Sequence, residues 1–224
     1  MKDNLSAFSS REYDEKTKQT LPFYEEYYTQ TIELVKMACH SSVNWLDIGC
    51  GTGKMGSVVF DNELNLDKFV FCDSSEEMIR ISKERFHSYN NTEFCVCDVR
   101  ELPFVNEFHV ISAIQVFHYL QTADRKDALK RCYEALTENG LFISFENFAP
   151  FTDTGKAISL ERWKKYQIEQ GKTQEEAQKH IERYGIGYYP ITIEENLKLM
   201  RDCGFSVVEI LWLTNMQAGF WGIK

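Results

Sequence analysis

The most constraining feature of this sequence is an apolar run that ends in three closely spaced glycines. Residues 43–48, VNWLDI, have the pattern of a buried strand, and residues 49–53, GCGTG, follow them directly. Glycines allow a sharp turn and a close approach of the backbone to a ligand. In open α/β sheets, ligands bind in the crevice beyond the carboxyl ends of the strands. The pattern therefore predicts a ligand site next to residues 46–53.

Strand and helix patterns alternate along the chain after this turn. Strand patterns are found at residues 43–48, 68–72, 93–97, 108–114 and 141–145, and helix patterns at 54–60, 76–87 and 124–136. Strands separated by helices pair in parallel through right-handed crossovers. Helices then cover both faces of the sheet, which explains why the strands are almost continuously apolar. The alternation predicts a doubly wound α/β fold.

The two ends of the chain and one insertion depart from this alternation. Residues 1–40 contain two helix patterns, from Ser9 to Lys18 and from Leu21 onward. Residues 151–189 are charged, aromatic and helical, so we expect an inserted cap over the sheet. Residues 192–224 contain a helix and then two strands, 205–213 and 217–223, whose short link requires an antiparallel hairpin. We expect a single domain with its cofactor-binding core at residues 43–147.

Charge and composition argue against several classes of protein. The net charge is −9 and no Lys/Arg-rich run is present, so a nucleic acid is a poor candidate for the substrate. No apolar run approaches the roughly 20 residues that cross a membrane, and residues 1–13 lack a signal-peptide pattern. The seven cysteines include no CxxC pair, which indicates free thiols and no metal site. These features predict a cytoplasmic protein with a small-molecule substrate.

Two kinds of cofactor fit the glycine turn. Residues 51–56 also match the G-x-G-x-x-G dinucleotide pattern, and Asp73 follows at the spacing expected for a ribose-binding acid. However, Asp47 precedes the glycines, and its carboxylate suits an amino group while it would repel a pyrophosphate. Asp98 ends the third strand, where it can accept a hydrogen bond from an adenine amino group. The C-terminal hairpin also leaves no second domain for a hydride acceptor.

Taken in order, residues 47–53, 73–74 and 98–99 resemble the successive motifs of class I S-adenosylmethionine-dependent methyltransferases. The resemblance covers about residues 43–147. It implies a seven-stranded, mostly parallel sheet in the order 3-2-1-4-5-7-6, with strand 7 antiparallel. It also implies S-adenosyl-L-methionine as the cofactor and S-adenosyl-L-homocysteine as the product.

The same resemblance implies the contacts with the cofactor. Asp73 would bind both ribose hydroxyls, Asp47 would lie near the amino group, and Asp98 would meet the adenine edge. The other residues expected at the cofactor are Tyr13, Gly49, Cys50, Gly51, Ser74, Met78, Val99 and Gln115.

Candidates for catalysis and substrate binding come from the remaining polar and aromatic residues. His118 is a candidate general base because histidine changes charge near neutral pH. The alternative is a structural histidine whose hydrogen bonds are satisfied at a strand–helix junction. Glu146 follows the fifth strand and is expected to orient a substrate. Trp163, Tyr184 and Tyr188 of the cap are candidates for a substrate pocket, and a small packing core is the alternative.

The function predicted from these features is an in-line methyl transfer to an O, N, S or C atom of a small molecule. Residues 113–119 lack the Asn/Asp-Pro-Pro-Tyr motif of DNA amino-methyltransferases, which argues against base methylation. Two alternatives remain open. The C-terminal region also resembles the synthase that makes carboxy-S-adenosylmethionine, an enzyme that modifies the cofactor itself. The second alternative is a protein that binds the cofactor without catalysis.

Overall fold

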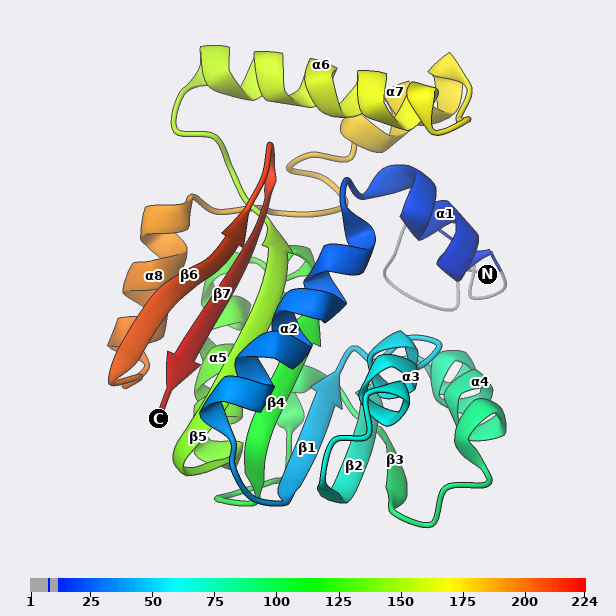
Figure 1. The fold of residues 1–224 in the computed structure, drawn as a ribbon. Helices are drawn as coiled ribbons and strands as arrows, with labels where there is room; N and C mark the ends of the chain where they lie inside the picture. The colour runs from blue at the N-terminus through cyan, green and yellow to red at the C-terminus, as the bar shows by residue number, and fades with distance from the viewer. Residues whose placement is uncertain (1–7, 9–11) are drawn as a thin grey trace.

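The computed structural model describes residue 8 and residues 12–224, and its centre is a seven-stranded sheet (Figure 1). The sheet has the order β3-β2-β1-β4-β5-β7-β6, in which only β7 runs antiparallel to its neighbours. The strands are β1 (Val43–Ile48), β2 (Leu66–Asp73), β3 (Thr92–Val96), β4 (Phe108–Ile114), β5 (Leu136–Asn147), β6 (Val207–Leu213) and β7 (Gln217–Ile223). The predicted fold class and strand order are therefore confirmed.

Helices cover both faces of the sheet. The α-helices of the described chain, including those that lie beyond the strand ends, are α1 (Tyr13–Thr20), α2 (Tyr24–Ala38), α3 (Lys54–Asp61), α4 (Glu76–Phe86), α5 (Thr122–Ala135), α6 (Asp153–Glu169), α7 (Gln174–Ile181) and α8 (Ile193–Asp202). Two short 3-10 helices, η1 (Val99–Glu101) and η2 (Phe117–Tyr119), follow β3 and β4. One apolar core joins α2, α3 and α4 to the sheet, and a second joins α5 and α8 to the opposite face.

Strand periodicity explains why two cores form. Successive side chains of a strand point to opposite faces. Trp45 and Phe69 belong to the core beneath α2, whereas their neighbours Leu46 and Val70 belong to the core beneath α5. Because both faces are buried, every one of these four side chains is at most 1% exposed.

Two predicted boundaries are wrong, and each has a local cause. The second helix was expected from Leu21, but it begins at Tyr24 because Phe23 adopts a left-handed φ of 54°. The fifth strand was expected from Leu141, but it begins at Leu136, which pairs with Phe108 before a register shift. The predicted start of the first helix at Ser9 lies outside the described residues.

The cap lies over the carboxyl ends of the parallel strands. Figure 1 shows α6 and α7 beyond these ends, with α1 between them and the sheet. The side chain of Trp163 in α6 is 1% exposed, and its Nε1–H donates a hydrogen bond of 2.6 Å to the carbonyl of Thr20 at the end of α1. The cap and α1 are thus joined by a buried hydrogen bond.

We expect Trp163→Phe to destabilise the protein. The substitution leaves the buried carbonyl of Thr20 without its donor, which costs about 1–3 kcal/mol. For a chain of this size, a loss of 1 kcal/mol lowers the melting temperature by about 2–4 °C, so we expect a fall of roughly 2–12 °C. Differential scanning calorimetry would measure the fall. Trp221→Phe, a half-buried residue of β7, is the control; an equal fall for both variants would show that the Thr20 hydrogen bond contributes nothing.

Candidate functional site

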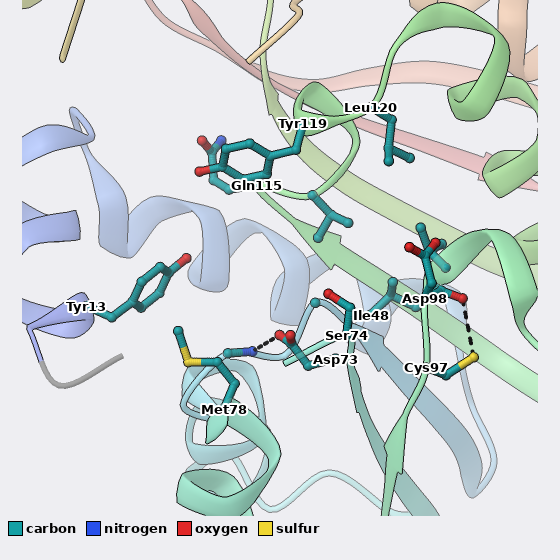
Figure 2. Close-up of a pocket in the computed structure, with 14 residues that line it drawn as sticks. Tyr13, Ile48, Asp73, Ser74, Met78, Cys97, Asp98, Gln115, Tyr119 and Leu120 are labelled. Carbon is teal, nitrogen blue, oxygen red and sulfur yellow. Dashed lines mark hydrogen bonds between the residues drawn. The ribbon is translucent and has the colours of Figure 1, made fainter. Parts of the chain in front are cut away.

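The main cleft lies at the carboxyl ends of β1, β2, β3 and β4 (Figure 2). Its cavity is about 90 Å³ in volume. Nine of the residues predicted to contact the cofactor line it: Tyr13, Gly49, Gly51, Asp73, Ser74, Met78, Asp98, Val99 and Gln115. The two others, Asp47 and Cys50, line a smaller cavity beside it, together with Tyr24 and Tyr28 of α2. Sequences far apart in the chain therefore meet at one crevice.

The glycine turn brings bare backbone to the wall of the cleft. Gly49 has a φ of 61°, and a Cβ atom placed on it would lie 2.5 Å from Cγ2 of Val116. Gly51 has a φ of 54° and lies under the ring of Tyr13, where a Cβ atom would be 3.6 Å from Cε1. The positive φ favours glycine at both positions, and at Gly49 the closeness of Val116 does so as well. The turn therefore leaves the backbone accessible to a ligand.

Asp73 fixes the glycine turn from the end of the neighbouring strand. Its Oδ2 accepts a hydrogen bond of 3.0 Å from the amide of Gly51, and its Oδ1 accepts one of 2.8 Å from the amide of Ser75. A carboxylate can accept about four hydrogen bonds, so capacity remains for two hydroxyl groups of a ligand. Burial raises the pKa of this carboxyl, and the amides of Ser75, Gly51 and Ser74 oppose the shift.

Asp98 closes the cleft at the end of β3. Its carboxylate accepts hydrogen bonds from the side chain of Arg100, with Oδ1 2.9 Å from Nε and Oδ2 2.8 Å from a terminal guanidinium nitrogen. The Arg100 side chain lowers the pKa of Asp98, and its effect outweighs burial, which would raise that pKa. Asp98 is therefore ionised and suited to accept a hydrogen bond from an amino group.

Asp47 is buried beside the cleft without a cation bonded to it among the described residues. It is 2% exposed, and its Oδ1 accepts a hydrogen bond of 2.6 Å from Ser112, which in turn accepts one from Trp45. Burial raises the pKa of Asp47 to about 7. A ligand ammonium group in this small cavity would provide the missing positive charge.

Tyr13 covers the glycine turn from α1. Asp14, the next residue, accepts a hydrogen bond of 2.6 Å from the hydroxyl of Thr52 in the turn. It also forms an ion pair of 3.2 Å with Arg85 in α4. These contacts hold α1 over the cleft, and Figure 2 shows the hydroxyl of Tyr13 directed toward its centre. The N-terminal helix is therefore part of the site.

His118 and Glu146, the predicted catalytic and substrate-orienting residues, bind each other away from the cleft. His118 is 1% exposed, and its Nδ1 lies 2.8 Å from Oε2 of Glu146. The carboxylate of Glu146 also accepts the backbone amides of Phe117 and His118, at 3.0 and 2.9 Å. Burial lowers the pKa of His118 although Glu146 raises it. The pair fixes the turn that carries Gln115 and Tyr119 into the cleft.

The cap aromatics predicted to bind substrate pack against one another instead of lining the cleft. Tyr188 is 2% exposed, and its ring lies 6.1 Å from His118, 6.2 Å from Trp163 and 5.8 Å from Tyr184. The alternative interpretation, a small core that secures the cap, describes this arrangement better.

A second, smaller chamber adjoins the main cleft, and we call it the Thr17 chamber. Tyr13, Gln115 and Tyr119 line both spaces, so the two are continuous. The remaining lining comes from Phe8, from α1 and the residue that follows it, from the end of β5 and from α7: Phe8, Thr17, Thr20, Leu21, Asn147 and His180. The sequence analysis missed Thr17 and His180, because a threonine or histidine within a helix pattern gives no signal until the helices are placed.

The described part of the chain has neither a candidate membrane-spanning helix nor a candidate metal site. It contains no helix long and apolar enough to span a membrane. It also contains no group of three or more His, Cys, Asp or Glu residues arranged to hold a metal ion.

The fold and the cleft together define the class I S-adenosylmethionine-dependent methyltransferase fold. The strand order, the glycine turn after β1 and the acids after β2 and β3 are all in place. The residues also fit the cofactor, because Asp73 has free acceptor capacity and Asp47 lacks a cation. Residues 46–140 match the family model of a methyltransferase domain. The resemblance predicted from the sequence is confirmed, and S-adenosylmethionine is confirmed as the cofactor at the level of the family.

Solved structures and relatives extend this comparison. A chain from a complex between the Haloferax volcanii Trm112 methyltransferase activator and a methyltransferase covers 100% of this chain and 98% of its own, with a TM-score of 0.68 and 15% identity. A Haemonchus contortus phosphoethanolamine N-methyltransferase with S-adenosylhomocysteine covers 81% of this chain and 38% of its own, with a TM-score of 0.57 and 17% identity. The carboxy-S-adenosyl-L-methionine synthase of Helicobacter hepaticus is 27% identical over 205 residues, which are 89% of this chain and 85% of the relative.

We expect Asp73→Ala to weaken binding of S-adenosylhomocysteine by about 2–4 kcal/mol, because charge-assisted hydrogen bonds in a crevice are strong. Isothermal titration calorimetry would measure the loss. Ser75→Ala is the matched control, since it removes the N-cap of α4 without altering the cleft. Undiminished affinity of the Asp73 variant would mean that this carboxylate only holds the backbone.

Asp47 predicts a pH dependence of stability. Burial raises the pKa of Asp47 to about 7 in the folded chain, whereas an exposed aspartate has a pKa of about 3.9, so the folded state binds a proton more tightly. Stability contributed by the protonated group is therefore lost as the pH rises from about 4 to 7. In the ligand-free protein at pH 8, we expect Asp47→Asn to be more stable than the parent by on the order of 1–3 kcal/mol.

The advantage of the Asp47 variant should shrink steadily as the pH falls from about 7 toward about 4 and should reverse when S-adenosylhomocysteine is present, because the ligand ammonium then stabilises the carboxylate. Melting curves between pH 5 and pH 8.5, with and without ligand, would measure both effects. A constant difference between parent and variant across this range would contradict the assignment.

Proposed function

We propose that this protein binds S-adenosylmethionine and adds a carboxyl group to the methyl carbon of that cofactor. In this reaction the methyl carbon loses a proton and forms a bond to the carboxyl carbon. The bond from that carbon to the donor breaks, and the donor keeps its electron pair and takes up a proton, so the positive charge on sulfur is retained. A small molecule that donates the carboxyl group is then the second substrate. The proposal replaces methyl transfer as the first choice and takes up the first alternative from the sequence.

The extent of the similarity carries this proposal. The methyltransferase domain model ends at residue 140, before the cap and the C-terminal hairpin. The similarity to the Helicobacter hepaticus synthase extends over 89% of the chain and therefore includes most of these later segments. Because the cap lies over the carboxyl ends of the strands, it is the segment best placed to determine what reacts with the cofactor.

The electrostatics beside the cleft support the same proposal. Tyr119 lines both the main cleft and the Thr17 chamber, and burial raises its pKa to about 12 although the Arg183 guanidinium, which is hydrogen-bonded to it, opposes the shift. A cation and a phenol hydroxyl next to the methionine end of the cleft would stabilise a carboxylate. Ordinary methyl transfer places no carboxylate on the cofactor, so it does not require this cation and this hydroxyl.

Methyl transfer to a small acid is the second candidate. It is supported by the methyltransferase domain model over residues 46–140 and by the Haemonchus contortus N-methyltransferase among the structural neighbours. The two candidates share the cofactor and differ in the product. Methyl transfer releases S-adenosylhomocysteine, whereas carboxylation leaves a cofactor that still carries its methyl carbon.

We expect incubation with S-adenosylmethionine and a panel of small 2-oxo acids and dicarboxylates to yield carboxylated cofactor, detected by mass spectrometry. Arg183→Met should lower its formation by about 10- to 100-fold, which corresponds to about 1.4–2.7 kcal/mol. Binding of S-adenosylhomocysteine should stay unchanged. Arg162→Met, on the exposed side of α6, is the matched control. Accumulation of S-adenosylhomocysteine together with a methylated acid would replace this proposal by the second candidate.

A further inference from the structure

The Thr17 chamber contains polar side-chain atoms that lack hydrogen-bond partners. Thr17 is 4% exposed, and its Oγ1 has no partner among the described residues. The Nδ1 of His180, across the chamber on α7, is buried and equally without one. A buried polar atom without a partner costs about 1–3 kcal/mol. Two such atoms in the lining of one chamber indicate that a bound ligand provides their hydrogen bonds.

A buried positive charge lies directly behind the chamber. Lys172 is 5% exposed, and its Nζ donates hydrogen bonds to Oγ1 of Thr20 and to Oε1 of Gln167, which are both neutral acceptors. Burial, together with the nearby charge of Lys16, lowers the pKa of Lys172 to about 8. An ammonium group buried among neutral acceptors is unfavourable unless a negative charge comes close. Because Thr20 also lines the chamber, the ammonium group is only one hydrogen bond behind its wall.

A larger cavity on the outer side of the cap leads toward the same place, and we call it the cap cavity. Its volume is about 240 Å³, and its lining contains the cations Lys16, Lys172, Lys179 and Arg183 but only one acid, Glu176. His180 and Phe8 line both this cavity and the Thr17 chamber, and their rings stack at 6.2 Å. The cations of the cap cavity thus extend from the outer surface to the stacked rings of Phe8 and His180, which also border the Thr17 chamber.

We propose that the Thr17 chamber binds the carboxylate of a small organic acid, with Thr17 and His180 as its hydrogen-bonding contacts and Lys172 as its counter-charge. The acid is the second substrate, so this inference rests on the proposed function. It enters through the cap cavity, where the cations attract it. The chamber measures about 30 Å³, so it admits only the small head group of such an acid. Gln115 and Tyr119 line both spaces, so the rest of the acid extends past them toward the cofactor's methionine end.

Thr17→Val is the sharpest test, because it replaces an unpartnered hydroxyl by a methyl group of the same size. Protein saturated with S-adenosylhomocysteine would be titrated with pyruvate, malonate and inorganic phosphate. We expect pyruvate or malonate to raise the melting temperature of the parent, and phosphate to have no such effect. The variant should keep the parent's melting temperature and its affinity for S-adenosylhomocysteine, but should bind the acid at least tenfold more weakly. Thr29→Val, at an exposed position of α2, is the matched control.

Lys172→Met tests the counter-charge, with Lys165→Met as its control because Lys165 is an exposed residue of α6 that already pairs with Glu169 and lies outside both cavities. The acid affinity should fall at least tenfold in the Lys172 variant only. A purely structural Lys172 would lower the melting temperature and leave the acid affinity of the folded protein unchanged, which would overturn the proposal. If this variant does not fold, Thr17→Val decides the question.

The failures of the two proposals are distinguishable. A parent protein that does not bind S-adenosylhomocysteine would refute the proposed function. A parent that binds it but ignores both acids, or responds equally to phosphate, would refute the carboxylate site alone. Unchanged acid affinity in Thr17→Val would do the same.

Discussion

The carboxylate of Asp73 holds the main cleft together. Parallel pairing of β1 with β2 places the end of one strand beside the end of the other, so that Asp73 reaches the amide of Gly51 and the amide of Ser75 at once. One side chain thereby fixes both the glycine turn and the start of α4. The same carboxylate retains acceptor capacity for a ligand, so the residue that shapes the cleft is also its principal polar contact. Burial of this charge is sustained by the backbone amides.

A second carboxylate, Glu146, fixes the opposite wall. It accepts amides from the turn after β4, and this turn holds Gln115 at a left-handed φ of 61°. The carbonyl of His118 in this turn accepts the amide of Tyr189, and Arg125 donates to the carbonyl of Tyr189. The wall of the cleft and the end of the cap are therefore one hydrogen-bonded unit. His118 matters through this unit, as a residue that positions its neighbour Tyr119.

The cap and α1 turn a general cofactor fold into a particular site. Trp163 joins the two through the carbonyl of Thr20, and Lys172 joins them through the hydroxyl of the same residue. The net charge of the chain is −9, yet the cap cavity, which α1 and α7 border, is lined mainly by cations. Such a local concentration of positive charge attracts anions to this part of an otherwise acidic protein.

The sequence by itself determined the sheet and most of the residues that line the main cleft. Apolar strands alternating with helices admit few topologies, and Gly49, Asp73 and Asp98 lie at strand ends, where short-range sequence and geometry coincide. The tertiary structure alone decided what the cap does. Trp163 and Tyr188 look like pocket residues in the sequence, but they face inward because the cap needs a core of its own. Thr17, Lys172 and His180 meet only after α1, α6 and α7 have packed together, and contacts among segments more than 150 residues apart leave no periodic pattern in the chain.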